Sequence, residues 1–184
     1  MMTQRHKVFV SYHHANDQKY RDNFESLFSD KHNIIVSKSV QIGDIDINLK
    51  TETIRQKIRD EYLSDSTVTV ILIGSETWKR KHVDWEISSS IRSTKNNSRS
   101  GLLGIILPSY PREDISKYNR YTIPPRLYDN LNCGFASIHN WSNDPKKVQA
   151  WIHEAFLRRN SILPSNSRDL YINNCSENKS SWKP

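Results

Sequence analysis

Glu86 is the residue whose place in the sequence best suits chemistry, because it follows a strongly apolar run. Residues 68–73 read VTVILI, a β-branched run bounded by turn residues, which predicts a strand covered on both faces. Strands of this kind belong to parallel sheets, and ligands bind beyond the carboxyl ends of such strands. The helix that we expect over residues 79–92 therefore carries Glu86 close to a predicted crevice.

Helical periodicity indicates which way Glu86 points. An arc of about 80° holds three apolar side chains that we expect to face the sheet: Val83, Ile87 and Ile91. Glu86 lies about 100° from the centre of that arc, so its carboxylate can be partly desolvated and still reach a cleft. The same position also suits an ordinary boundary residue that pairs with His82 or Arg92. Geometry alone leaves both interpretations open.

Further side chains are expected near the same crevice. The first strand, over residues 6–12, brings polar groups to its carboxyl end: Ser11, His13, His14 and Asp17. Residues 15–17 also offer a helix cap, which suffices to explain Asp17. His82 shares one side of the later helix with Trp85, which lies nearly opposite the apolar arc. An outward tryptophan suggests a contact surface, although it can instead cover a neighbouring loop.

Two more segments can contribute to the site. The polar loop over residues 37–48 could form a flexible rim, with Asp44, Asp46 and Asn48 as its polar groups. Phe9 and Tyr12, in the first expected strand, could help to form a pocket. Phe9 equally suits the core, which is the interpretation that we favour for it.

Several other kinds of site are excluded by motif. The five glycines form neither GxGxxG nor a P-loop, and the strand over residues 68–73 is followed by Gly74 and Ser75 rather than by the aspartate of a receiver domain. Cys133 and Cys175 form no CxxC, and no Cys/His pair has zinc spacing. We therefore expect no metal and no bound cofactor.

Composition bounds the class of protein. The chain has 184 residues, 35% hydrophobic and 26% charged, which predicts a globular protein. No apolar run suits a membrane span and no secretory signal is visible, so we expect no membrane association and a cytoplasmic location. The net charge of +7 raises the possibility of an anionic partner. For the basic run over residues 79–82 we favour a solvated helix end over a nucleic-acid site.

Strands alternate with amphipathic helices along the chain. We expect strands over residues 6–12, 33–37, 68–73, 102–107 and 135–138, the last one the weakest, with an extended connection over residues 109–131 that holds at most one short helix. This alternation predicts βαβ units and an α/β fold, a flavodoxin-like three-layer sandwich around a five-stranded, mainly parallel sheet. Residues 1–160 should form the domain. Residues 161–184 are Asn- and Ser-rich, and we expect a polar C-terminal extension that is loosely packed or disordered.

Two segments of this chain resemble the Toll/interleukin-1 receptor (TIR) family. The opening KVFVSYHHAND resembles the first strand and box of TIR domains. The stretch SDSTVTVILIGSETW with HVDWEI is similar to the third strand and following helix of the TIR-like proteins of bacterial antiphage defence, in particular the Thoeris type. The resemblance covers roughly residues 6–158. His82 stands where the family often has a tryptophan, four residues before the glutamate.

The resemblance implies an activity and its residues. Catalytic TIR domains cleave NAD and release nicotinamide, and Thoeris members make from it an ADP-ribose-derived signalling nucleotide that activates a separate effector. It implies Glu86 as the catalytic residue and NAD as substrate rather than cofactor. Six residues are expected to bind the substrate: Phe9, Ser11, His13, Asp46, Asn48 and His82. It also implies self-association through TIR–TIR contacts, with the loop over residues 37–48 completing the site of a neighbour.

Two alternatives remain open on the sequence alone. The chain can be a non-catalytic TIR interaction module, in which Trp85 rather than Glu86 matters. It can also be a nucleoside deoxyribosyltransferase-like or nucleic-acid-acting enzyme on the same sandwich, as its positive charge suggests. We favour the NAD-cleaving enzyme and do not expect a nucleic-acid partner.

Overall fold

A parallel five-stranded sheet forms the centre of the molecule. The computed structural model describes residues 5–38 and 49–183. The strands are β1 (His6–Ser11), β2 (Ile35–Lys38), β3 (Val68–Ile73), β4 (Gly101–Ile106) and β5 (Ala136–Asn140). They pair in the order β2-β1-β3-β4-β5, each pair parallel. The α/β prediction of a flavodoxin-like sandwich with a parallel sheet is therefore confirmed.

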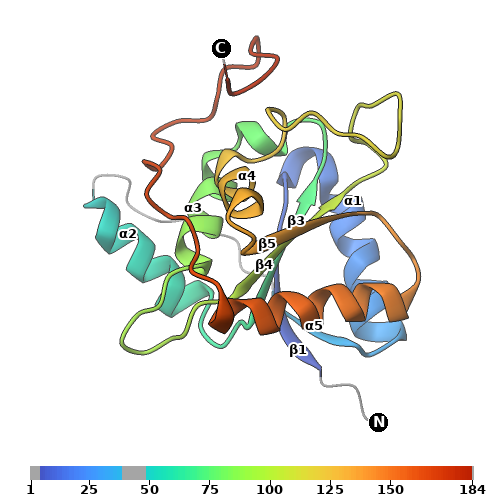
Figure 1. Ribbon diagram of the computed structural model, residues 1–184, viewed down its shortest axis with the longest axis horizontal. Helices are drawn as coiled ribbons and strands as arrows, with labels where there is room; N and C mark the ends of the chain where they lie inside the picture. The colour runs from blue at the N-terminus through green and yellow to red at the C-terminus, as the bar shows by residue number, and fades with distance from the viewer. Residues whose placement is uncertain (1–4, 39–48, 184) are drawn as a thin grey trace.

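Helices cover both faces of this sheet (Figure 1). They are α1 (His14–Glu25), α2 (Thr51–Lys57), α3 (Lys81–Ser90), α4 (Pro125–Asn132) and α5 (Pro145–Ser161), with the shorter helical turns η1 (Ser26–Lys31), η2 (Ile58–Tyr62) and η3 (Thr77–Lys79). One core cluster joins α1 and α5 to the sheet, through residues such as Phe24 and Ile152. The clusters on the opposite face belong to α2, α3 and α4, through residues such as Ile54, Ile87 and Leu127. The molecule therefore has three layers.

Alternation along β1 decides which face each side chain joins. Val8 and Val10 pack with α1 and α5, whereas Phe9 packs on the opposite face with residues of η2 and α3. Side chains two residues apart on a strand point to the same face, so Ser11 lies on the face of Phe9. The carboxyl end of β1 thus presents Ser11 towards the layer that contains α3.

The tail over residues 162–183, for which we expect loose packing or disorder, has no fully buried residue but is bonded to the domain. After α5 this segment runs back past α4 and α3 (Figure 1). Its backbone is bonded to the domain: Cys175 N–H donates to Lys79 O at 2.8 Å, and Trp182 N–H donates to Tyr121 O at 3.0 Å. The boundary between residues 160 and 161 stays a prediction.

Smaller differences concern the ends of the elements. Asp144 caps α5 by accepting from the backbone N–H groups of Lys146 and Lys147, the role typical of an aspartate directly before a proline at a helix start. The start of α1 differs, because the helix begins at His14 and no side chain caps it.

In the described parts of the chain, every helix is too short or too polar to span a membrane.

Candidate functional site

Glu86 is buried between α3 and β1. Its side chain is 3% exposed, and its Oε2 accepts a hydrogen bond from the Ser11 hydroxyl group. Ser11 is 1% exposed. The site thus pairs a carboxyl group from the middle of α3 with a hydroxyl group from the carboxyl end of β1.

Burial changes the acidity of this carboxyl group. Desolvation raises the pKa of Glu86 from 4.5 to about 8, against a smaller lowering by the hydrogen bond from Ser11. A carboxyl group with this pKa holds its proton at neutral pH until a positive charge is brought beside it. Strongly perturbed carboxyl groups of this kind cluster at functional sites.

The packing of α3 explains why Glu86 faces inward. Val83, Ile87 and Ile91 join the core beneath α3, as the helical spacing predicts. The alternative in which Glu86 is an ordinary boundary residue fails, since its hydrogen-bond partner is Ser11, and Arg92 instead pairs with Glu52. Glu86 is also more deeply buried than its place at the edge of the arc suggests, because β1 closes over it.

The other predicted site residues lie at different depths. Phe9 is 1% exposed and packs against Ile58 and Trp85, so it belongs to the core next to the site. His13 is 5% exposed, and its Nδ1 has no hydrogen-bond partner among the described residues. Burial, followed by the charge of Arg80, lowers the pKa of His13, which therefore stays neutral at physiological pH.

His82 lies one helical turn before Glu86 on α3. Its ring is half-buried and meets the ring of Trp85 edge-on, with the ring centroids 5.8 Å apart. Burial, followed by the charges of Lys81 and Arg80, lowers the pKa of His82.

Asp46 and Asn48 lie outside the described residues, so their part in the site stays a prediction.

Asp17 has a role that the sequence did not reveal. It is 2% exposed and accepts from Ser109 Oγ at 3.3 Å, so the prediction that it acts in a helix cap is wrong. Gly74 leaves room for the Asp17 carboxyl group, because a Cβ atom at this position would overlap it. Asp17 therefore ties α1 to the loops that follow β3 and β4.

Trp85 is 4% exposed, so the interpretation of an outward contact surface is wrong. Its indole N–H donates to Tyr171 O at 2.8 Å, and Leu170 packs against the same cluster. The alternative, in which the tryptophan covers a neighbouring segment, describes it correctly. That segment is the C-terminal tail, more than 80 positions away in the sequence.

No pattern in the sequence predicted the buried ion pair between Asp84, in α3, and Arg126, in α4. Arg126 and Asp84 are 0% and 2% exposed in their side chains, with Arg126 Nε 2.9 Å from Asp84 Oδ1. Arg126 follows two prolines in a segment without clear periodicity. Arg126 differs from a surface arginine only in its full burial, and burial is known only once the fold is known.

Within the described residues, the candidate site residues belong to no metal-binding cluster, and they do not line the hollow beside β4 and β5. Among the described residues, no group of three or more His, Cys, Asp or Glu side chains could hold a metal ion. A hollow of about 440 Å³ lies by the ends of β4 and β5, with His139, Arg112 and Trp151 in its wall. None of the candidate site residues lines it.

The five-stranded parallel sheet with helices on both faces is that of an α/β protein of the flavodoxin-like, TIR-like class. Residues 9–112, more than half of the chain, match the model of the TIR-like domain of the Thoeris protein ThsB. The chain therefore belongs to the Thoeris ThsB TIR-like family and is a TIR-type module of antiphage defence. The matched part contains both Ser11 and Glu86. No curated protein matches the chain.

Proposed function

We propose that this protein is an NAD-cleaving TIR enzyme that releases nicotinamide and makes an ADP-ribose-derived signal. The observation that carries the proposal is the buried carboxyl group of Glu86, held by Ser11 at the carboxyl end of β1. In a parallel α/β sheet this is the edge where ligands bind. Membership of the Thoeris family supports the same substrate.

The charge of the substrate complements this site. The nicotinamide ring of NAD is a cationic pyridinium, and a positive charge within a few ångströms of a carboxyl group favours its ionised form. NAD binding therefore lowers the pKa of Glu86 from its value of about 8 in the free protein and releases the proton. The free carboxyl group is neutral, and the occupied site holds a carboxylate.

The bond that breaks joins the nicotinamide nitrogen to the ribose carbon. Its electron pair goes to the nitrogen, so nicotinamide departs neutral, while the ribose develops oxocarbenium character as in glycoside cleavage. The Glu86 carboxylate stabilises that positive charge in a site with little water. A hydroxyl group, from water or from the remaining nucleotide, then bonds to the ribose carbon and loses its proton. Glu86 accepts this proton readily, because its pKa lies near the working pH.

The remaining parts of the proposal concern partners and location. NAD is the substrate and no cofactor takes part. Copies of the chain associate, with the loop over residues 37–48 completing the site of a neighbour, and the nucleotide product acts on a separate effector in the cytoplasm. Nicotinamide release per molecule should therefore rise with protein concentration. A rate per molecule that stays constant on dilution would contradict the self-association.

The test is incubation of concentrated protein with NAD, with all products followed by chromatography and mass spectrometry. The wild type should release nicotinamide, and the mass of the second product distinguishes hydrolysis, cyclisation and conjugation. Glu86→Gln should release none while it keeps the fold by circular dichroism. Glu61→Gln, at an exposed carboxyl group of η2, is the matched control and should remain active. Turnover by Glu86→Gln equal to that of the wild type would overturn the proposal.

A further inference from the structure

The C-terminal tail is bonded to one continuous stripe of α3. We name residues 163–183 the C-terminal strap. Four positions of α3 hydrogen-bond to it: Lys81, Asp84, Trp85 and Ser88. Their spacing is i, i+3, i+4 and i+7, which places them on one side of the helix. Glu86 lies about 150° around the helix from the middle of this stripe, so it faces away from the strap.

Both ends of the stripe are held by asparagine side chains of the strap. At the start of α3, Lys81 N–H donates to Asn174 Oδ1 at 3.0 Å. Towards its end, Ser88 Oγ donates to Asn166 Oδ1 at 3.1 Å, and Asn166 Nδ2 donates to Ser88 O at 2.9 Å. Asn166 and Asn174 thus fix the two ends of the stretch that contains Glu86.

The middle of the stripe is held by one residue of the strap. Tyr171 N–H donates to Asp84 Oδ2 at 3.0 Å, and Tyr171 O accepts from the Trp85 indole at 2.8 Å. Asp84 and Trp85 immediately precede Glu86 in the sequence. A shift of the strap at Tyr171 would therefore act on the turn of helix that carries the glutamate.

The helix needs this external support. α3 has only 10 residues, and the residue that precedes it, Arg80, makes no capping hydrogen bond with its side chain. A helix of this length is marginal without tertiary contacts, and uncapped N–H groups at its start weaken it further. Asn174 supplies the missing acceptor from a distant part of the chain, in the manner of an N-cap residue.

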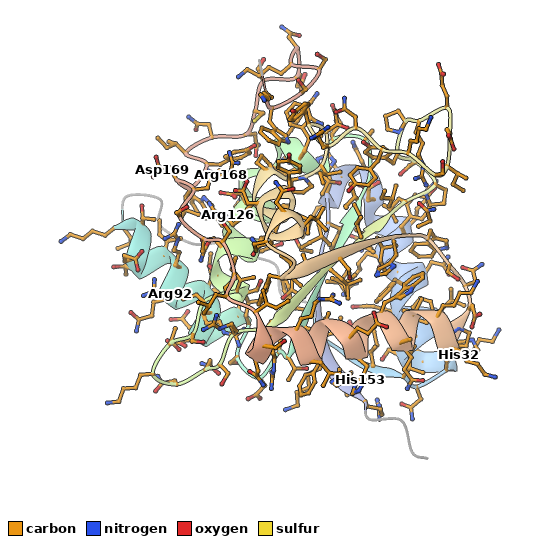
Figure 2. All side chains as sticks on the ribbon, viewed as in Figure 1. His32, Arg92, Arg126, His153, Arg168 and Asp169 are labelled. Atoms are coloured by element: carbon orange, nitrogen blue, oxygen red, sulfur yellow. The ribbon has the colours of Figure 1, made fainter. Side chains whose placement is uncertain are left out.

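The strap is in turn anchored to the domain along its length. Arg126, in α4, donates to Asn166 Oδ1, to Arg168 O at 2.8 Å and to Asp169 O at 3.1 Å, as well as to Asp84. Arg126, Arg168 and Asp169 lie together where the strap passes α4 (Figure 2). At its far end, Trp182 Nε1 donates to Ile123 O at 2.9 Å. The strap is therefore a fixed structure that reaches α3 from the outside.

From this arrangement we propose that the C-terminal strap is a brace that positions Glu86. The strap holds the outer side of α3, while Ser11 holds the carboxyl group on the inner side. The site then depends on the strap although no strap residue bonds to Glu86. This inference rests on the proposed function, because the position of Glu86 matters to the rate only if Glu86 acts on a substrate.

The test loosens the strap by point substitution in the full chain. The double variant Asn166→Ala/Asn174→Ala removes both asparagine contacts to α3 and should lower kcat for nicotinamide release by about tenfold or more, since small displacements at a catalytic group have effects of this size. KM for NAD should change much less, because the strap contacts α3 on the side away from Glu86. Asn173→Ala is the matched control, since the exposed Asn173 side chain has no hydrogen bond to the described residues. Its kcat should equal that of the wild type.

Two further measurements separate positioning from a loss of the fold. Asn174→Asp keeps an acceptor at the start of α3 and should retain kcat, whereas Asn174→Ala alone should lose part of it. In the double variant, hydrogen exchange should become faster at the amides of Tyr171 and of α3, with the sheet still protected. A double variant with wild-type kcat would overturn the brace, and so would one with raised kcat, which would make the strap inhibitory. A wild type without turnover would instead refute the proposed function.

Discussion

Replacement of Glu86 by glutamine should stabilise the protein, and increasingly so as the pH rises. Burial raises the pKa of this carboxyl group from 4.5 to about 8. Between these two values the folded protein holds a proton that the unfolded chain has released, so the free energy of unfolding of the wild type falls as the pH rises. Glutamine keeps the shape and an oxygen that can accept from Ser11, but it has no ionisation to suppress.

The size of the effect follows from the displacement of the pKa. With a pKa of 4.5 in the unfolded chain and about 8 in the folded protein, the wild type should lose about 3 kcal/mol of stability between pH 5 and pH 8 that Glu86→Gln retains. In a chain of 184 residues this corresponds to roughly 6 to 12 °C in Tm. The difference should be small at pH 5, where the carboxyl group is neutral in the folded protein.

The assay is urea unfolding of both proteins at a series of pH values from 5 to 8, with the difference in the free energy of unfolding plotted against pH. Glu61→Gln, at an exposed position, controls for the loss of one negative charge. The difference for Glu86→Gln should grow steadily over this range. A difference that is the same at both ends of the range would refute the reasoning, because it would mean that Glu86 is already ionised in the folded protein at pH 5.

Three further predictions concern the site and its surroundings. In the wild type, kcat/KM for NAD should rise with pH towards about 8, because this ratio reports the ionisation of Glu86 in the free enzyme. The profile of kcat should level off at lower pH, because bound NAD lowers the pKa of Glu86. Identical profiles would contradict ionisation on binding. In the wild type, the hydrogen bond from Ser11 lowers the pKa of Glu86, so Ser11→Ala should raise this pKa and move the kcat/KM profile to higher pH. An unmoved profile would contradict this role of Ser11. Arg126→Met should reduce the free energy of unfolding by about 3 kcal/mol in urea, since it leaves Asp84 buried without its charge partner; a loss below about 1 kcal/mol would argue against that pairing.

The sheet was predictable from the sequence because its strands carry their signal locally. The run over residues 68–73 is observed as β3 with the same bounds, and β4 is displaced by a single residue from the predicted range. The start of α5 was also predictable, since Asp144 followed by Pro145 satisfies the first N–H groups of a helix by itself. The start of α1 was not, because no side chain caps it and the buried Asp17 imitates a cap in the sequence.

The site was predictable only in part. Helical spacing placed Glu86 at the edge of the buried face of α3, but its partner Ser11 lies 75 positions away and is defined only when β1 and β3 are adjacent. The strap was missed because polar residues hold it through single hydrogen bonds, such as that of Asn174, which leave no periodic pattern. Helical spacing left Trp85 either on a contact surface or over a neighbouring segment, and only the strap identifies that segment.

The measurement that tests the central claim most directly is nicotinamide release from NAD by concentrated wild-type protein and by Glu86→Gln under the same conditions. The wild type should release nicotinamide at a rate that increases with protein concentration, and the folded Glu86→Gln variant should release none above background. Release by the variant at the wild-type rate would contradict the role given to Glu86. No release by the wild type at any concentration would instead favour a TIR module that acts through binding alone.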